Sequence, residues 1–220
     1  MHLRHIDCGL QILYRTSLRQ VPAILILPTL NTATPNNCGM SAKKVTVLIA
    51  GQLASGTTEV AQLVGSSTGL PVESTESFFR KIAAEFQESF QYLERISKSG
   101  EVDLEKVLEG MARDKVAEGN VIIEGRSALL AIDCNVTLKV FLHKDLADRK
   151  KSLMARRGVS EEEATRELYA SDQEREHYFR VRLNADWEDS KFYDLTINTS
   201  KVNHQQAAQL IESALKATGR

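Results

Sequence analysis

The sequence predicts an α/β domain with a five-stranded parallel sheet, and two observations lead to this fold class. Short apolar runs rich in β-branched residues alternate with longer segments whose apolar residues recur at intervals of three and four. Strands that alternate with helices in this way build parallel sheets covered by helices. The second observation is a glycine-framed loop directly after the first strand, at the edge of the sheet where such folds bind ligands.

Length and composition are those of one globular domain without a global electrostatic preference. The chain has 220 residues, 42% of them hydrophobic and 26% charged, and its net charge is −1. Such a chain has no field that attracts nucleic acid or an anionic membrane, so an anion site has to be a local cluster of cations. No apolar run approaches the roughly 20 residues of a membrane span. We therefore expect no nucleic-acid and no membrane partner.

Three scattered cysteines, Cys8, Cys38 and Cys134, form no C-x-x-C pair and no Cys/His ligand spacing. A structural zinc site is therefore not expected. A sparse, odd number of cysteines is typical of a reducing compartment, so we expect a cytoplasmic protein.

Residues 1–42 differ from the rest of the chain. They are basic and poor in acids, and they contain a short apolar piece between Pro22 and Pro28 and a turn-rich tract after it. Three interpretations are open: a flexible tail, a transit or signal-like segment, or a non-native extension upstream of a true start at Met40. We favour a disordered or non-native extension, because the first strand begins only five residues after Met40. The domain itself is expected at residues 43–220.

The first strand, at residues 45–49, leads into a predicted phosphate loop. Two glycines at the ends of this loop allow backbone dihedrals closed to other residues, so successive N–H groups can surround a phosphate. The helix that begins near Thr57 adds its unpaired N–H groups and the positive end of its dipole. The loop consists of Gly51, Gln52, Leu53, Ala54, Ser55, Gly56, Thr57 and Thr58.

The loop departs from the pattern G-x-x-x-x-G-K-[ST] at one position, because Thr57 stands where lysine is usual. The hydroxyl of Thr58 is placed to bind Mg²⁺. Loss of one transition-state donor costs on the order of 3 kcal/mol, so a catalytic site would need cations from other segments. The alternative is a glycine-rich strand-to-helix turn that binds nothing.

The next elements are a helix that ends at Gly69, a short strand at residues 71–73, and a helix that Ser74 opens as an N-cap. Arg80 lies near the start of this otherwise apolar helix, which favours a ligand as its partner. The apolar stripe of the helix consists of Phe78, Phe79, Ile82 and Phe86.

A charged helix at residues 102–117 precedes the third strand, at residues 121–126, which ends in an acid, a glycine and a cation. Glu124 at the end of an apolar strand would be costly unless it is solvated or paired, which favours a functional role. The fourth strand is expected at residues 137–142. The phosphate loop, Glu124 and the loop after Asn198 all follow strand ends, so they should converge.

A cation-rich helix at residues 145–157 ends at Gly158, and Ser160 opens a capping box for a helix that runs toward Arg182. A last strand at residues 193–198 and a last helix at residues 205–217 complete the domain. The cations are Arg149, Lys150, Lys151, Arg156 and Arg157, and a solvated helix face is the alternative explanation for each of them.

Four features taken together with the loop resemble the cytidylate kinase-like family of P-loop nucleoside monophosphate kinases, including its archaeal-type members, over about residues 44–218. They are S-x-x-x-x-x-R from Ser74 to Arg80, the E-G-R triplet, the cation-rich helix, and D-x-x-R followed by Trp187 and YDLTINTSK. The last stretch is the most specific. The resemblance implies a three-layer P-loop NTPase fold with helical segments that bind the monophosphate and form a lid, the lid roughly at residues 150–185.

The resemblance also implies roles for individual residues. The loop would hold the donor phosphate of ATP, and Thr58 would bind Mg²⁺, with Glu124 acting on the metal through water. The residues facing the acceptor nucleotide would be Ser74, Arg80, Arg126, Asp172 and Arg175. The catalytic cations would be Arg126, Arg149, Arg156 and Arg175. Asp172 would contact the base or orient Arg175; an exposed ion pair between these two, worth under about 0.5 kcal/mol, is the alternative.

Two positions depart from the family pattern. Ser152 stands where a lid arginine is common, and Leu168 stands where bacterial members commonly place an arginine. The main hypothesis is ATP-dependent phosphorylation of CMP or dCMP by a monomer or weak dimer whose partners are small-molecule nucleotides. A non-catalytic nucleotide-binding regulator and a kinase of another small metabolite stay open.

Overall fold

The computed structural model describes residues 44–86 and 103–218. The predicted extension at residues 1–42 and the predicted start of the charged helix at Val102 lie outside these residues. No helix of the described part is long and apolar enough to cross a membrane.

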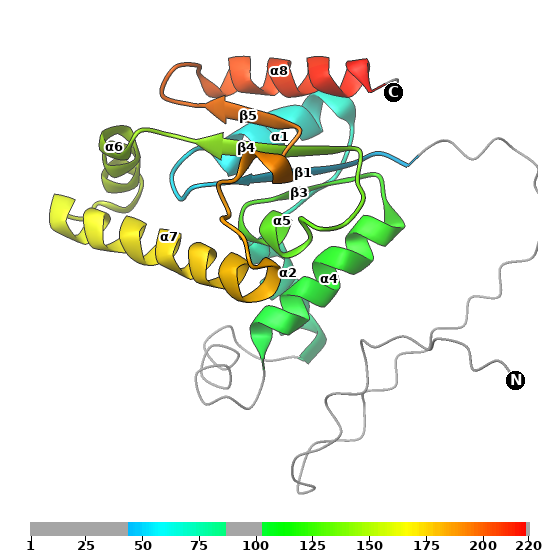
Figure 1. The fold of residues 1–220 in the computed structure, drawn as a ribbon, viewed down its shortest axis with the longest axis horizontal. Coiled ribbons are helices and arrows are strands. Elements are labelled where there is room, and N and C mark those ends of the chain that lie inside the picture. Colours follow the sequence, from blue (N-terminus) through cyan, green and yellow to red (C-terminus); the bar gives the residue numbers. More distant parts are fainter. Residues whose placement is uncertain (1–43, 87–102, 219–220) are drawn as a thin grey trace, which may run out of the picture. The chain divides into compact units, whose positions relative to one another are not determined.

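A five-stranded parallel sheet forms the centre of the domain. Its strands are β1 (Thr46–Gly51), β2 (Val72–Glu73), β3 (Val121–Glu124), β4 (Leu138–His143) and β5 (Leu195–Asn198). They lie in the order β2-β3-β1-β4-β5, of which Figure 1 labels β3, β1, β4 and β5. In the register, Ile49 of β1 lies opposite Glu124, and Gly51 lies opposite Leu142. The predicted fold class, α/β with five parallel strands, is confirmed.

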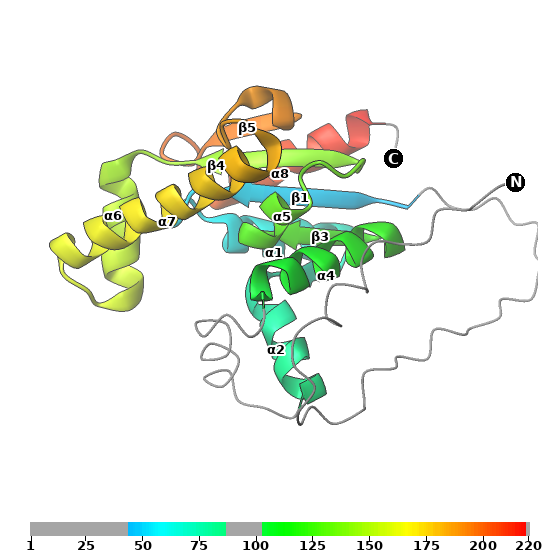
Figure 2. The same cartoon turned by 60° about the horizontal axis from the view of Figure 1, so that its bottom comes forward.

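Helices cover both faces of the sheet. They are α1 (Thr57–Thr68), α2 (Thr75–Phe86), α4 (Leu104–Glu118), α5 (Arg126–Leu130), α6 (Leu146–Arg157), α7 (Glu161–Leu183) and α8 (His204–Ala217). On one face α1 and α8 enclose a core that includes Val47, Val140 and Ile211. On the other face α2, α4, α5 and the end of α7 enclose a second core around Phe78 and Phe179. Two cores separated by one sheet give the expected three layers (Figure 2).

The consecutive helices α6 and α7 extend past the carboxyl ends of the strands (Figure 1). A small cluster of buried residues, Leu153, Ala164 and Leu168, joins the two helices, and Leu53 and Ala54 of the phosphate loop pack against it. The predicted glycine end of α6 at Gly158 and the capping box at the start of α7 are both present. The predicted lid is therefore packed directly on the loop.

Several boundaries differ from the sequence predictions for local reasons. β3 ends at Glu124 rather than Arg126, because Gly125 has φ 68° and turns the chain into α5, which was not predicted. β4 runs one residue later than expected. β5 begins at Leu195 rather than Tyr193, since a 3-10 helix, η2 (Ser190–Phe192), occupies the preceding residues.

Candidate nucleotide-binding site

A cleft of about 460 Å³ opens at the carboxyl ends of the strands. It brings together the phosphate loop, the start of α2, the end of β3, and arginines from α6 and α7. The residues predicted for the site that line it are Gly51, Gln52, Leu53, Ala54, Gly56, Thr57, Thr58, Ser74, Arg80, Glu124, Arg126, Arg156 and Arg175. Ser55, Arg149 and Asp172 are not among the lining residues. Segments more than 100 residues apart in the sequence thus meet at one place, as the strand-end rule predicts.

The phosphate loop is shaped by close backbone contacts. A Cβ atom on Gly51 would lie 2.4 Å from the carbonyl oxygen of Leu142, and one on Gly56, which has φ 92°, would lie 2.4 Å from the ring of His204. Gly56 caps α1 without a side-chain hydrogen bond. The first N–H groups of α1 therefore stay available, which is the arrangement that binds anions.

The ends of the loop are tied to the rest of the sheet edge. The side-chain oxygen of Gln52 accepts from the backbone N–H of Lys144 at 3.0 Å, and its Nε2 donates to Glu188 at 2.8 Å. The hydroxyl of Thr199 donates to the carbonyl oxygen of Ser55 at 2.8 Å. Ser55 is buried, and its own hydroxyl has no hydrogen-bond partner in the described part of the chain. These bonds hold the loop in place from the β4 and β5 sides.

Thr58 and Glu124 form an oxygen-rich corner next to the loop. The Thr58 hydroxyl donates to Oε1 of Glu124 at 3.2 Å, and Glu124 is 5% exposed. Burial raises the pKa of Glu124, hydrogen bonds from Thr57 and Thr58 oppose this shift, and the charges of Glu59 and Glu76 add to it. A hydroxyl and a carboxylate facing a wet cleft fit Mg²⁺, which binds one or two protein oxygens and keeps several waters.

Arg126 and Arg80 line the part of the cleft between α5 and α2. Arg126 begins α5 directly after the third strand and pairs with Glu105 at 2.8 Å and with Glu174 at 3.1 Å. Arg80 is exposed and pairs with Glu76 at 3.4 Å. Both guanidinium groups are accessible from the cleft, so a phosphate can compete for them.

Arg175 is the most deeply placed cation of the cleft. Burial lowers its pKa to about 10, and the nearby charge of Arg126 adds to this shift. Its Nη1 donates to the carbonyl oxygen of Ser171 at 2.8 Å, whereas its Nε is buried with no hydrogen-bond partner among the described residues. The guanidinium carbon lies 5.9 Å from the centre of the Trp187 ring. Arg175 also lines the cleft, so its guanidinium group lies next to the space that the other arginines face.

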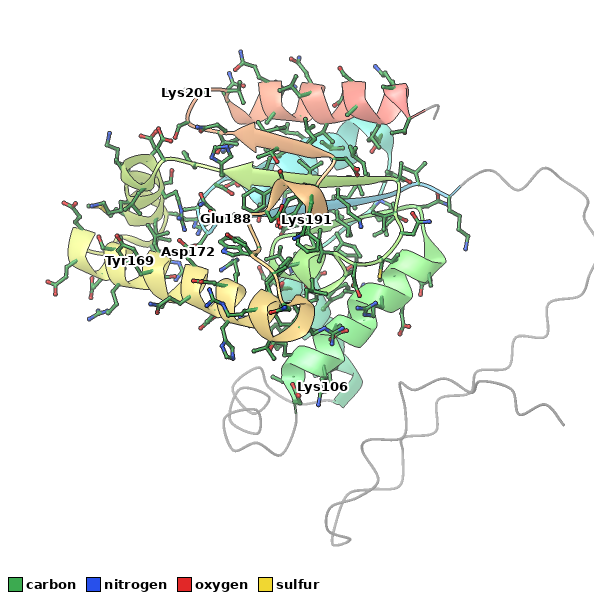
Figure 3. All side chains as sticks on the ribbon, viewed as in Figure 1. Lys106, Tyr169, Asp172, Glu188, Lys191 and Lys201 are labelled. Carbon is green, nitrogen blue, oxygen red and sulfur yellow. The ribbon has the colours of Figure 1, made fainter. Side chains whose placement is uncertain are left out.

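Asp172 pairs with Arg149 and forms no hydrogen bond or ion pair with Arg175 in the described part of the chain, so the alternative of an exposed Asp172–Arg175 ion pair is wrong. Both terminal nitrogens of Arg149 donate to the carboxylate, at 2.8 and 2.7 Å, and its Nε donates to the carbonyl oxygen of Leu53 at 2.9 Å. Asp172 lies on the side of α7 that faces the sheet (Figure 3). Arg149 is 3% exposed, so the solvated-face interpretation is wrong for it.

The other cations of α6 are placed in different ways. Lys150 pairs with Glu161, Lys151 lies 3.9 Å from Asp148, and neither lysine is among the residues that line the cleft. Arg156 lines the cleft, is exposed, and has no hydrogen bond or ion pair with any described residue.

Ser152 and Leu168, the two residues that depart from the family pattern, lie in different environments. Ser152 accepts from Lys144 Nζ at 2.9 Å. Leu168 is fully buried in the apolar cluster between α6 and α7, where a charged arginine would lose its contact with water.

Sequence reasoning missed several contacts that shape the site. His204 lies against Gly56, and Glu105 and Glu174 hold Arg126, although none of these residues was singled out. Among the residues that contact the loop, Thr199 could have been found from the sequence, since it belongs to the YDLTINTSK motif. The others depend on which helices meet in space, which no local pattern reports.

Comparisons with known proteins agree with this geometry. The family model of the cytidylate kinase-like family matches residues 46–201. The cytidylate kinase of Pyrobaculum islandicum is 29% identical over 170 residues, which cover 76% of this chain and 90% of that protein. The cytidylate kinase of Pyrococcus horikoshii is 29% identical over 179 residues, covering 80% and 91%.

Solved structures support the fold. An uncharacterized protein from Eubacterium ventriosum aligns with a TM-score of 0.59 at 21% identity, covering 79% of this chain and 99% of that one. A shikimate kinase from Bacteroides thetaiotaomicron aligns with a TM-score of 0.55 at 13% identity, covering 78% and 98%. At these identities the likeness concerns the fold alone. The match of the family model over most of the chain goes further: the chain belongs to the cytidylate kinase-like family of P-loop nucleoside monophosphate kinases.

Proposed function

We propose that the protein transfers the γ-phosphoryl group of ATP to CMP or dCMP. The observation that carries the proposal is the cleft itself, where the loop, Arg80, Arg126, Arg156 and Arg175 face the same space. Phosphoryl transfer needs alignment, charge neutralisation and exclusion of water more than covalent help from the protein. The preference for cytosine is supported by the names of the relatives, which are cytidylate kinases.

The donor half of the site is the phosphate loop. Its backbone N–H groups and the start of α1 bind the β-phosphate of ATP, as helix N-termini bind anions. Thr58 and Glu124 would hold the magnesium ion that accompanies ATP, Glu124 through water. When bound, the metal neutralises charge on the β- and γ-phosphate oxygens. Glu124 would act here as a carboxylate, the form that burial disfavours and that the hydrogen bonds from Thr57 and Thr58 favour.

The acceptor half of the site lies between α2 and α5. Ser74 and Arg80 from the start of α2 and Arg126 from α5 face the acceptor nucleotide, and Arg175 from α7 adds a guanidinium group to the same space. Guanidinium groups suit this task because they bind phosphate oxygens in pairs. We propose that helices α6 and α7, within a lid at roughly residues 150–185, close over the phosphates and bring in Arg156.

For Arg149 and Asp172 the proposed substrate contacts require a change of partner. Arg149 reaches a phosphate only by exchanging its two bonds to Asp172, and Asp172 then becomes free to meet the acceptor base. Lid closure is the step that would make this exchange.

A purified full-length chain tests the proposal. ADP release from ATP is measured in the presence of CMP, dCMP, UMP and AMP and of small metabolites with an acceptor hydroxyl. We expect release to be stimulated most by CMP or dCMP, and to fall at least 100-fold in Arg126→Ala. Stimulation by one of the other metabolites alone would favour a kinase of that metabolite. Tight ATP binding without turnover would favour a regulator, an alternative that Thr57 in the lysine position supports.

A further inference from the structure

Arg126 is held by two carboxylates that come from different helices. Its Nη2 donates to Oε1 of Glu105 on α4 at 2.8 Å, and its Nη1 donates to Oε2 of Glu174 on α7 at 3.1 Å. The Glu105 side chain is 42% exposed and that of Glu174 61%. An acceptor phosphate needs N–H groups of the same guanidinium, so it has to compete with these carboxylates.

The two carboxylates are supported differently. Glu105 lies on α4, which packs directly against α5, the helix that Arg126 begins, through Leu104, Leu108 and Leu129. Helix α7 reaches this core only with its end, at Phe179, and its first half packs on α6 and the phosphate loop. Glu105 is therefore the carboxylate that stays with Arg126 if α6 and α7 move. Glu174 belongs to α7, has the longer bond to Arg126 and is the more exposed of the two. It is the partner that a phosphate can replace at the lower cost.

The two carboxylates also offset the repulsion between neighbouring guanidinium groups. Arg126 and Arg175 are near enough for the charge of one to act on the other. Two guanidinium groups that face the same space repel each other unless an anion lies between or beside them. Glu105 and Glu174 supply that negative charge. A phosphate dianion brings its own, so the contribution of Glu174 becomes dispensable when the acceptor binds.

We propose that Glu105 is a positioning residue that keeps Arg126 directed at the acceptor phosphate, and that Glu174 occupies the place of this phosphate until the phosphate displaces it. The proposal rests on the function proposed above, because it assigns the Arg126 ligand to the phosphate of the acceptor nucleotide. It predicts effects of opposite sign from two carboxylates on one arginine.

Four variants of the full-length chain test this: Glu105→Ala, Glu105→Gln, Glu174→Ala and the control Glu176→Ala. Glu176 lies on α7 and pairs with Arg180, outside the cleft. Alanine is a good helix former, so the helices should persist in every variant, which circular dichroism checks. The dissociation constant of CMP is measured by calorimetry without ATP, and KM and kcat are then measured with ATP.

We expect Glu174→Ala to bind CMP about three- to fivefold more tightly, with KM lowered and kcat within about twofold of the wild type. Glu105→Ala should bind CMP at least threefold more weakly. Glu105→Gln should recover part of this loss, since the amide oxygen still accepts from Arg126. The control should bind like the wild type.

Other outcomes decide against the inference or separate it from the proposed function. Tighter binding in both alanine variants would mean that only the net charge of the cleft matters, and unchanged binding in both would mean that neither carboxylate acts on Arg126; each result overturns the inference. If the expected pattern appears in a protein that binds CMP but forms no CDP, the inference holds and the proposed function fails. A wild type that binds no nucleoside monophosphate contradicts both.

Discussion

At the scale of single residues, the cation that Thr57 does not supply has to come from elsewhere in the cleft. Arg156 lines the cleft and, among the described residues, has no partner to give up. We expect Arg156→Ala to lower kcat about 100-fold, because loss of one transition-state donor costs about 3 kcal/mol. Steady-state kinetics with ATP and CMP measure the effect.

A second substitution serves as the control for this prediction. Thr57→Lys restores the usual residue of the loop, whose amine reaches the β- and γ-phosphate oxygens. Added to Arg156→Ala, this substitution should raise kcat at least tenfold above that of Arg156→Ala alone. It should not rescue Arg126→Ala, since that arginine is assigned to the acceptor. Equal rescue of both backgrounds, or of neither, would contradict the role given to Arg156.

Glu73, at the end of β2, leads to a prediction about pH. Burial raises its pKa, but hydrogen bonds from Lys81 and Ser77 and the charge of Lys81 outweigh burial, so its pKa is lower than usual. The carboxylate therefore stabilises the fold above the unfolded-state pKa, and this contribution disappears as the pH falls through the lowered pKa. Lys81 is 45% exposed, which limits the contribution to about 1 kcal/mol.

The measurement compares wild type and Glu73→Gln by urea unfolding between pH 7 and pH 3. The difference in the free energy of unfolding should be largest at neutral pH and vanish at the acidic end. A difference that stays constant across this range would show that the pair contributes nothing that depends on ionisation.

At the scale of elements, the pair Arg149–Asp172 joins α6, α7 and the phosphate loop. Asp172→Asn leaves a guanidinium that is 3% exposed without a counter-charge. The free energy of unfolding should fall by about 3 kcal/mol, at the lower end of the range for buried pairs because Asp172 is 28% exposed. Urea unfolding followed by circular dichroism measures this change.

The double variant Arg149→Met with Asp172→Leu separates structural support from a catalytic role. Replacing both charges by apolar side chains should recover most of the lost stability. If Arg149 acts only as a link to the loop, the kcat of the double variant should be close to that of the wild type. If it binds a phosphate after lid closure, as the sequence predicts, the stable double variant stays at least tenfold slower than the wild type. A double variant no more stable than Asp172→Asn would argue against the buried-charge explanation.

At the scale of the whole molecule, local signals predicted the strands, the capped helices and the convergence of the site. The glycine end of α6 and the capping box of α7 depend on neighbouring residues, and both are present. The short helix α5 was not predicted, because five residues are too few to show a helical period in the sequence. The partners of Asp172 and Arg126 could not be predicted, since they depend on how α4, α6 and α7 meet in space.

The arginines of the cleft illustrate the difference between what the sequence predicts and what only side-chain packing determines. Their presence in the site follows from a rule about strand ends and from a family resemblance, and Arg80, Arg126 and Arg175 do line one cleft. Their present partners follow from side-chain packing, which has no sequence signature. The sequence therefore predicted that these three arginines gather, and the structure adds the side chains with which they pair.

The central claim is that one cleft encloses a continuous chain of phosphates between two nucleosides. Calorimetry with adenosine and cytidine joined through five phosphates tests it most directly, because such a ligand fills both halves of the site at once. The account predicts at least 100-fold tighter binding than that of ATP or CMP alone, lost largely in Arg126→Ala. Binding no tighter than that of ATP alone, in a folded wild-type protein, would contradict it.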